Sequence, residues 1–432
     1  MSIEKDLPDG WNILKLGSVC TQPQYGYTTS GAKEGNIKLL RTTDITSGNI
    51  NWEKVPFCLE NPKDIDKYLL SEGDIVISRA GSVGVSYLLK KVEPSVFASY
   101  LIRFKPIQTI ISPKYFYLFL KSPFYWNEIT EKSLGIAVAN VNATKLKEIE
   151  IPVPSIEEQD LIVEKIEELF SELDKGIENL KIAQQQLKVY RQAVLKWAFE
   201  GKLTNENVKD GELPEGWEWV TIDQLLSSKK KGMTTGPFGT ALKKSEHQLS
   251  GVPVLGIENI GEGVFKMPNK IFITNEKAAE LKSFIVYNDD IIISRSGTVG
   301  EICSVPKFMD KSIISTNLIK VSLNKEIINP KYFVYMFQGG KVTMQVKELC
   351  KGSSRAFLNQ TILSNLEFPL CSIQEQKEVV QEIESRLSVC DKMEETITNS
   401  LQQAEALKQS ILKRAFEGKL VKKEIFTYAN NE

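Results

Sequence analysis

The chain carries the same series of motifs twice, in the same order. LPDGW at residues 7–11 returns as LPEGW at 213–217, and DIVISRAGSVG at 74–84 returns as DIIISRSGTVG at 290–300. ISPKYF, IPVPSIEEQ and AFEGKL each have a second version in the same way. The second copy lies 206 residues after the first at the opening pentapeptide and 216 or 217 residues after it elsewhere. A period of that length indicates a duplicated domain pair with a pseudo-twofold axis, because solenoid repeats are far shorter.

The first part of each copy has mixed secondary structure. The runs DIVIS and DIIIS are short, β-branched and bounded by turn residues, which predicts buried strands. PKYFYLFLKS and PKYFVYMFQ start with proline and place apolar residues at helical spacing, which predicts short helices with proline in the first turn. Each copy is therefore predicted to begin with a small α+β domain.

The second part of each copy is predicted as one long helix. Ser155 and Glu158 fit a capping box, and Gly201 and Gly418 are placed as stops at the far ends of the two helices. Apolar residues recur between these caps at steps of three and four, which is a heptad seam. A helix over 155–200 would be about 67 Å long. The seam residues are Ile162, Ile166, Leu169, Leu173, Ile177, Leu180, Ala183, Leu187, Tyr190, Val194 and Trp197, then Ile383, Leu387, Cys390, Ile397, Leu401, Ala404, Leu407, Ile411 and Ala415, with an interruption at Glu394.

Such a helix is not stable alone, because one apolar stripe would face water. We expect the two long helices to pack against each other as an antiparallel coiled coil. The alternative is that each helix packs on its own globular part. The predicted order is an α+β domain over 1–154, a helix over 155–203, a polar linker over 204–212, a second α+β domain over 213–371, a second helix over 372–420 and a tail over 421–432.

Composition and motifs give no sign of a catalytic or metal site. Six cysteines are scattered without a Cys-x-x-Cys pair, and His247 is the only histidine, so we expect no structural metal. The chain has neither a G-x-G-x-x-G after a strand nor a G-x-x-x-x-G-K-[ST] phosphate loop. Ser-Pro-Phe-Tyr at 122–125 lacks the second proline of an adenine methyltransferase motif, and we interpret it as a turn and helix start. No residue is therefore predicted as catalytic, cofactor-binding or metal-ligating.

Hydropathy restricts where the protein can be located, and charge restricts how it could bind DNA. The opening residues have no apolar signal-peptide core, and no apolar run reaches the roughly 18 residues that span a bilayer, so we expect a cytoplasmic protein. The formal net charge is −1. A DNA-binding protein with this balance needs its basic and acidic residues on different surfaces.

The motifs together resemble the specificity subunit of type I restriction-modification enzymes. LPxGW opens each half, and LRTTDI at 40–45, GDIVISRAGSVG at 73–84, the IPVPSIxEQ junction and the AFxGxL helix end follow in the order of that family. The resemblance covers nearly the whole chain. It implies that each α+β domain is a target recognition domain that reads one half of a bipartite double-stranded DNA target.

The resemblance also implies partners that carry the chemistry. The long helices would form a spacer and dock two modification subunits, which hold S-adenosylmethionine and methylate adenine. Restriction and translocase subunits, with ATP and Mg, would complete the assembly. This chain would then be non-catalytic and hold no cofactor. Two alternatives remain open, namely a fused restriction-modification enzyme, against which the missing catalytic half argues, and a coiled-coil interaction protein without a DNA role.

Candidate DNA contacts lie in polar, glycine-bearing loops of the two α+β domains. Such loops suit phosphate contacts, and their aromatic residues can pack on sugars or bases. The alternative for each loop is an ordinary solvated surface. The candidates are Tyr25, Tyr27, Thr28, Thr29 and Lys33 in the first domain, and Lys229, Lys230, Lys231, Thr234, Thr235, Lys243 and Lys244 in the second.

Arg79 and Arg295 follow the predicted buried strand in both halves. Two halves that read different sequences would not share a base contact, so we weigh a shared phosphate contact against a structural ion pair that supports the turn. Ser82 and Thr298 in the same turns are further candidates, as are Arg41, Thr42 and Arg355. Arg41 aligns with Gly256 and Arg355 with Val138, and such differences are where half-site specificity could lie.

The long helices have an uneven charge. The start of the first helix is strongly acidic, which would repel DNA and fits a solvated or protein-facing surface. Its later part is basic, so it either lies nearer DNA or complements the C-terminus of the helix. The acidic residues are Glu157, Glu158, Asp160, Glu164, Glu167, Glu168, Glu172 and Asp174, and the basic ones are Lys181, Lys188, Arg191, Lys196 and Lys202.

Overall fold

The chain divides into two compact units, and each contains one α+β domain and half of each long helix. The first unit is Met1–Lys181 with Thr398–Glu432, and the second is Ile182–Ile397. The predicted boundaries follow the order along the chain, whereas packing groups the end of the second helix with the first domain. The structure is a computed structural model that describes residues 7–133, 140–229, 231–238, 241–309, 311–350 and 357–421.

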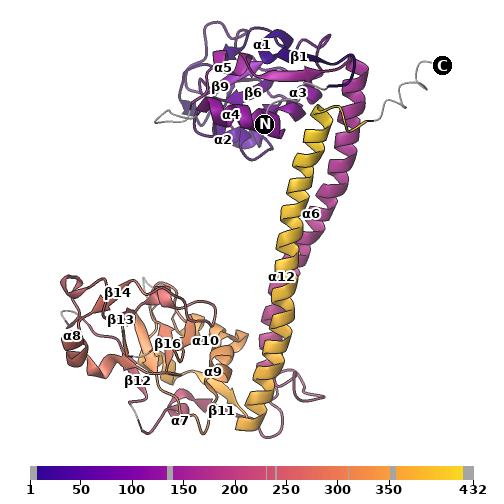
Figure 1. The fold of residues 1–432 in the computed structure, drawn as a ribbon. Helices are drawn as coiled ribbons and strands as arrows, with labels where there is room; N and C mark the ends of the chain where they lie inside the picture. The colour runs from indigo at the N-terminus through magenta and orange to yellow at the C-terminus, as the bar shows by residue number, and fades with distance from the viewer. Residues whose placement is uncertain are drawn as a thin grey trace. The chain divides into compact units, whose positions relative to one another are not determined.

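The α+β domain of the first unit is built on short strands (Figure 1). β1 (Asn12–Lys15) pairs with β10 (Glu150–Val153) in an antiparallel ribbon. One sheet has the order β2 (Gln24–Tyr25), β9 (Leu101–Phe104), β6 (Ile75–Ser78), β7 (Ser86–Leu88), and another has the order β3 (Gly31–Ala32), β5 (Phe57–Cys58), β4 (Lys38–Leu40), β8 (Ser95–Phe97). The helices are α1 (Leu16–Val19), α2 (Thr42–Ile45), the 3-10 turn η1 (Trp52–Lys54), α3 (Pro113–Phe119), α4 (Pro123–Ser133) and α5 (Ala143–Lys147).

The α+β domain of the second unit repeats this plan. β11 (Glu218–Thr221) pairs with β20 (Glu367–Leu370). One sheet has the order β12 (Met233–Thr235), β19 (Leu318–Val321), β16 (Ile291–Ser294), β17 (Ile302–Ser304), and another has the order β14 (Ile271–Ile273), β13 (Val252–Leu255), β18 (Ser312–Ile314), β15 (Ile285–Val286). The helices are α7 (Ile222–Leu225), α8 (Asn275–Glu280), α9 (Pro330–Gln338), α10 (Gly340–Leu349) and α11 (Gln360–Ser364), with 3-10 turns η3 (Lys244–Glu246), η4 (Ile257–Asn259) and η5 (Lys282–Phe284).

The duplicated sequence therefore folds into a duplicated topology. β6 and β16 are the predicted DIVIS and DIIIS strands, and every residue in both is buried. α3 and α9 are the predicted PKYF helices, and each has proline at its first turn. β4 runs parallel to β8, as β13 runs parallel to β18. The prediction of an α+β domain in each half is confirmed.

The two long helices, α6 (Ile156–Phe199) and α12 (Ile373–Phe416), have 44 residues each. Ser155 accepts a hydrogen bond from the backbone N–H of Glu158 at 3.3 Å, as a cap does. Gly201 and Gly418 have φ of 75° and 68°, the left-handed conformation that glycine adopts without strain. The predicted Ser155 cap and the two glycine stops are confirmed.

Within each unit, α6 and α12 lie side by side and antiparallel. In the first unit, Ile166 of α6 shares a core with Ile411 and Ala415 of α12, and Asp174 pairs with Lys408. In the second unit, Val194 and Ala198 of α6 share a core with Val379 and Ile383 of α12. The seam prediction is wrong at Trp197, which is 38% exposed, because the last turn of α6 turns Ala198 and Phe199 toward the second domain. It is also wrong at Tyr190 and Leu407, which are 38% and 49% exposed.

Each long helix packs on both α+β domains, one at its start and one at its end. The start of α6 belongs to the core of the first domain, and the Phe199 ring near its end lies 5.2 Å from the ring of Tyr332 in the second domain. The Phe416 ring near the end of α12 lies 5.1 Å from Tyr115 and 5.3 Å from Phe119 of the first domain. The helices pack on each other and also on the globular parts, so both predicted interpretations hold in part.

In each unit, three of the duplicated motifs meet at a junction between the α+β domain and the ends of the two long helices. Trp11 of LPDGW donates its indole N–H to Glu158 at 3.0 Å, and Trp217 of LPEGW donates to Glu375 at the same distance. A Cβ added at Gly418 would collide with Pro8, and one added at Gly201 would collide with Pro214. The Glu158 carboxylate, predicted to close a capping box, is directed to Trp11 instead. The motifs recur together because each junction needs all of them.

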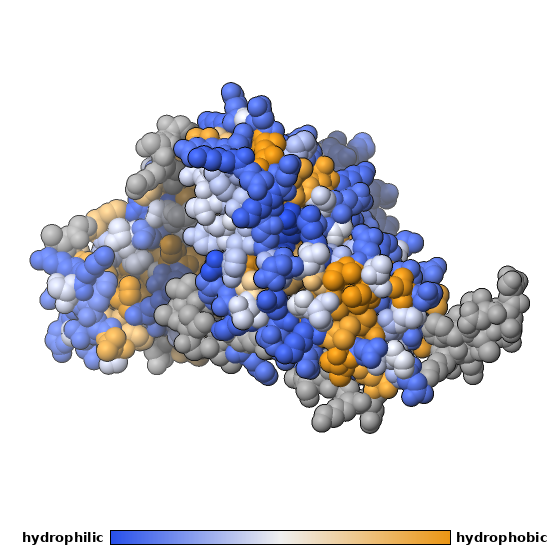
Figure 2. Space-filling model, turned by 90° about the horizontal axis from the view of Figure 1, so that it is seen from above, coloured by the Kyte–Doolittle hydropathy of each residue, from blue (hydrophilic) through white to orange (hydrophobic). Residues whose placement is uncertain are grey.

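Most large apolar side chains lie in the cores of the two units, and the face drawn in Figure 2 is mostly hydrophilic, with apolar patches between. In the part of the chain that the structure describes, no helix combines the length and the apolar character that a bilayer crossing requires.

Candidate nucleic-acid interface

An arginine-bearing turn follows the central buried strand in each unit. We name residues 79–84 and 295–300 the arginine turns. The φ of Gly81 is 76° and that of Gly297 is 78°, which a residue with a side chain rarely adopts. The N–H at the end of each turn bonds back to the carbonyl at the end of the strand, from Gly84 to Ser78 and from Gly300 to Ser294, both at 2.9 Å. The second turn therefore reproduces the backbone of the first.

Matching backbone hydrogen bonds hold both arginines in place. The N–H of each arginine donates to a carbonyl in the turn before β9 or β19, and its carbonyl accepts from the segment that leads into α5 or α11. These bonds are Arg79 N–H to Tyr100 O at 2.9 Å and Val141 N–H to Arg79 O at 3.0 Å, then Arg295 N–H to Asn317 O and Leu358 N–H to Arg295 O, both at 2.9 Å. Three chain segments therefore converge on each arginine turn.

The guanidinium groups lie against aromatic rings. The Arg79 guanidinium carbon is 4.9 Å from the centre of the Tyr25 ring. That of Arg295 is 4.9 Å from the Phe238 ring and 3.9 Å from the Phe357 ring. Arg295 is 5% exposed, and burial lowers its pKa. Cation–π contacts of this kind stabilise a guanidinium without a carboxylate.

These contacts bear on the two interpretations of the arginines. Among the residues that the structure describes, neither arginine has an ion pair, so the predicted structural ion pair is replaced by aromatic packing. The Nε atoms of both are buried and have no hydrogen-bond partner within the described ranges. Arg295 is too enclosed to meet a phosphate directly, whereas Arg79 is only half-buried.

The loop candidates of the first domain do not gather at one place. Tyr25 lies at the arginine turn, where its hydroxyl accepts a hydrogen bond from the backbone N–H of Ala143 at 3.0 Å. Tyr27 packs instead on Tyr68, with 5.4 Å between ring centroids. Thr28 and Thr29 lie on the loop into β3, Lys33 follows β3, and Ser82 lies on the arginine turn itself. Thr28, Lys33 and Ser82 are exposed, and Thr29 accepts a hydrogen bond from the backbone N–H of Glu60 at 3.3 Å.

Arg41 is held by a carboxylate next to it. Its guanidinium donates to both oxygens of Asp44, at 3.0 and 2.8 Å, and this hydrogen bonding raises its pKa. Asp44 also accepts from the Arg41 backbone N–H at 2.8 Å, as Asn259 does from Gly256 in the second unit at 2.9 Å. The backbone of this turn is thus the same in both units, although Gly256 takes the place of Arg41 in the second. The neighbouring Thr42 is half-buried, and its hydroxyl has no partner among the described residues.

In the second domain, β12 divides the loop candidates between its two ends. Thr235 lies near the arginine turn and accepts from Gln360 at 2.8 Å, while Thr234 is 2% exposed and does not suit a direct DNA contact. Lys229 lies beyond the other end of β12 and pairs with Glu326 at 3.7 Å. Lys231, Lys243, Lys244 and Thr298 are exposed, and Lys230 and Arg355 lie outside the described residues.

Several exposed residues at the arginine turns are not among the candidates predicted from the sequence. Tyr100 is 62% exposed, Phe238 is 59% exposed, Phe357 is 40% exposed, and Asn317 is also exposed. A signal for one pair of them was present. SYLIRF in the first copy aligns with TNLIKV in the second, so Tyr100 and Asn317 differ beside residues that match.

The described residues contain no group of three or more histidine, cysteine, aspartate or glutamate side chains that could hold a metal ion. The Ser-Pro-Phe-Tyr tetrapeptide at 122–125 is a helix start, as predicted. Ser122 is fully buried, α4 begins at Pro123, and the Tyr125 hydroxyl donates to the carbonyl of Gly84 at 2.8 Å. The Tyr125 hydroxyl thus binds the backbone of the arginine turn.

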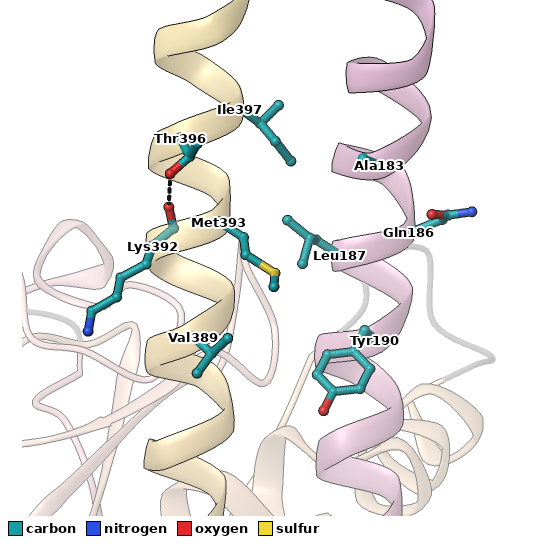
Figure 3. A pocket seen from close by; sticks show the side chains of 9 residues that line it. All are labelled: Ala183, Gln186, Leu187, Tyr190, Val389, Lys392, Met393, Thr396 and Ile397. Carbon is teal, nitrogen blue, oxygen red and sulfur yellow. Dashed lines mark hydrogen bonds between the residues drawn. The ribbon is translucent and has the colours of Figure 1, made fainter.

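An apolar groove runs along the helix pair of the second unit (Figure 3). The side chains of Leu187, Val389, Met393 and Ile397 point into the space between α6 and α12. The groove has a volume of about 520 Å³ and is open to solvent, and Val389 and Met393 are 51% and 52% exposed. Two helices alone thus leave part of their seam uncovered in this unit.

Comparison with known proteins gives the same division of the chain. The family model for the type I restriction modification DNA specificity domain matches residues 8–182 and again 214–403. The two matches coincide with the two copies, and together they cover most of the chain. The chain therefore belongs to the family of type I restriction-modification DNA specificity proteins.

Individual proteins extend this similarity over the full length. The chain is similar to the type I restriction enzyme StySPI specificity subunit of Salmonella potsdam, with 26% identity over 96% of this chain and 90% of the relative. The fold is similar to a chain from a study of complex assembly and conformational transition of the type I R-M system, with a TM-score of 0.75, 19% identity and coverage of 96% and 100% of the two chains. The HsdS subunit of Thermoanaerobacter tengcongensis matches with a TM-score of 0.57, 19% identity and coverage of 96% and 98%.

Proposed function

We propose that this chain is the DNA-reading subunit of a type I restriction-modification complex and recognises a bipartite double-stranded target. Each α+β domain would read one half of the target. The single observation that carries this proposal is the pair of arginine turns, which share their backbone hydrogen bonds and differ in the side chains around them. A common frame with different exposed residues is what two readers of different sequences require.

The same proposal assigns the chemistry to partner subunits in the cytoplasm. Modification subunits would bring S-adenosylmethionine and methylate adenine, and restriction subunits would bring ATP and Mg. The chain itself would hold no cofactor and would be catalytically silent. The family that matches is a DNA specificity family, which supports this division of labour.

The groove between α6 and α12 supports a docking role for the helix pair. Its exposed valine and methionine would be covered by an apolar helix of a modification subunit, since burying apolar surface drives association. At the offset of 217 residues, Val389 and Met393 correspond to Glu172 and Gly176. The two modification subunits would therefore dock on unequal surfaces.

The decisive experiment maps methylated adenines genome-wide in cells with and without this gene. We expect a split motif with a fixed gap that is lost on deletion and restored by the full chain. A motif that persists after deletion would refute the proposal. In parallel, the purified chain alone should not methylate DNA in the presence of S-adenosylmethionine, and activity of the chain alone would overturn its non-catalytic role.

A further inference from the structure

The turns before β9 and β19 have the same backbone and different exposed tips. Leu101 N–H bonds to Ala98 O at 2.8 Å in the first unit, and Leu318 N–H bonds to Ser315 O at 3.1 Å in the second. The tip residues, Tyr100 and Asn317, each offer a carbonyl to the arginine of the adjacent arginine turn at 2.9 Å. Because the backbone carbonyl makes this contact, it does not require a particular side chain at the tip of the turn.

The arginine itself is poorly placed to read sequence. Arg295 is 5% exposed between two phenyl rings, and Arg79 lies over Tyr25. A base-edge contact needs donors that reach into a groove of the duplex, and the enclosed guanidinium of Arg295 cannot extend that far. The half-buried guanidinium of Arg79 is held against the Tyr25 ring. The arginine therefore supports the convergence of three segments, and contact with a ligand falls to the exposed residues around it.

The tip residues are exposed in both units and differ in chemistry between the units. Tyr100 is 62% exposed and presents a ring and a hydroxyl. Asn317 presents an amide whose Oδ1 accepts a hydrogen bond from the Ser296 hydroxyl at 2.8 Å, which orients the group in advance. An oriented amide suits the donor and acceptor pair of adenine in the major groove, and a tyrosine suits apolar packing on a thymine methyl or a sugar.

We propose that Tyr100 and Asn317 are specificity-determining residues, each contacting one base pair of the half-site read by its own unit. The Asn317 amide contacts an adenine. This inference rests on the proposed function and adds the position at which the two readers differ. It also separates the task of Arg79 and Arg295, which is to hold the turns, from the task of reading.

The test uses the full chain, co-expressed with its modification subunits, and a DNA pool randomised at every position of the mapped target. Asn317→Ala should reduce the preference for adenine at one position of one half-site by about 5- to 150-fold. The other half-site should keep its wild-type preferences. Tyr100→Ala should relax one position of the opposite half-site and leave the first unchanged.

Matched variants keep the result interpretable. Leu249→Ala in the second unit and Ile13→Ala in the first remove other exposed side chains, 97% and 40% exposed, and should leave both half-sites unchanged. Asn317→Asp keeps the shape and the acceptor for Ser296 but loses the donor, so it should lose adenine preference as Asn317→Ala does. Thermal unfolding of each variant within a few degrees of wild type shows that the turn is intact.

The outcomes separate this inference from the proposed function. A wild-type complex that recognises a split motif, with variants at both tips that keep wild-type preferences, overturns the inference alone. A wild-type complex without a split motif overturns the proposed function as well. A variant at one tip that alters both half-sites equally also overturns the inference, because it would mean that the tip holds the fold instead of contacting one base pair.

Discussion

At the scale of single residues, the duplicated motifs are explained by the contacts they make. Glu375 accepts hydrogen bonds from Trp217 at 3.0 Å, Asn205 at 2.8 Å and Thr204 at 3.2 Å. Gln376, the next residue, is fully buried and bonds to the backbone of Asn329 and Cys371. The EQ pair of the motif therefore fastens the start of the long helix to the domain before it.

Glu375→Ala should destabilise the second unit by about 1.5–3 kcal/mol, because it leaves an indole N–H and an amide without their charged acceptor. Urea unfolding followed by tryptophan fluorescence measures the change. Glu378→Ala on the same helix, at an exposed position, is the control and should change stability little. Equal effects of the two variants would contradict the role assigned to Glu375.

Lys121 is a second residue whose surroundings give a measurable prediction. Its ammonium donates to the carbonyl of Ser86 at 2.9 Å, beside the ring of Tyr117. Burial lowers its pKa to about 8, and burial raises the pKa of Tyr117 to about 12. Between about pH 8 and its usual value near 10.5, the unfolded lysine binds a proton that the folded one does not, so this group makes stability rise with pH.

Lys121→Met removes that dependence, so its stability relative to wild type should be highest at pH 7 and fall by up to about 3 kcal/mol by pH 10.5. Guanidinium unfolding of both proteins at the two pH values gives the difference. The raised pKa of Tyr117 also affects stability near pH 10.5, but both proteins carry this tyrosine, so its effect cancels in the difference. A variant-to-wild-type difference that is the same at both pH values would exclude a depressed lysine pKa.

At the scale of elements, ion pairs accompany the helix seam. Lys408 pairs with Asp174 in the first unit, and Arg191 pairs with Asp391 at 2.6 Å and Glu394 at 3.1 Å in the second. Arg191 and Lys408 are equivalent positions at the offset of 217, as are Asp174 and Asp391. Glu394, which interrupts the predicted seam, is therefore a partner of Arg191.

Reversing one charge of the Lys408–Asp174 pair should destabilise the first unit, and reversing both should restore it. Lys408→Glu or Asp174→Lys alone places like charges together, at a cost of about 0.5–1 kcal/mol for an exposed pair. The double-mutant cycle, measured by thermal unfolding at low and high salt, isolates the pair from the packing of Lys408 on Phe170. A coupling energy of zero at low salt would show that the pair contributes nothing to the seam.

At the scale of the whole molecule, the first compact unit is discontinuous in sequence, whereas the second is one continuous stretch over Ile182–Ile397. The first unit needs residues near both ends of the chain, because Phe416 of α12 fills a place between Tyr115 and Phe119. The second AFEGKL motif, which comes after the second α+β domain in the sequence, thus completes the core of the first domain. Phe199 does the same for the second domain.

Phe416→Ala should open the first unit and leave the second intact, since a large-to-small change in a core costs about 3–5 kcal/mol. Hydrogen exchange resolved by peptide shows which unit loses protection. Leu407→Ala, at a 49% exposed position of the same helix, serves as the control. Loss of protection confined to the second unit would contradict the assignment of Phe416 to the first domain.

The sequence by itself determined the duplication, the buried strands, the caps and the two long helices. These features depend on near neighbours along the chain, because an N-cap serine, a positive-φ glycine or a β-branched run acts within a few residues. The antiparallel pairing of the helices also followed, since an exposed seam needs a partner and the duplication predicts a pseudo-twofold axis.

Only the tertiary structure decided which domain each helix end completes, and why Arg295 needs no carboxylate. Those contacts join residues far apart in the sequence, and their energy comes from burial, which no local pattern encodes. Thr234 shows the same limit from the other side. Its loop is polar and basic, yet β12 directs the Thr234 side chain into the interior. Tyr100 is the opposite case, because its backbone carbonyl is held by Arg79 while its side chain is exposed.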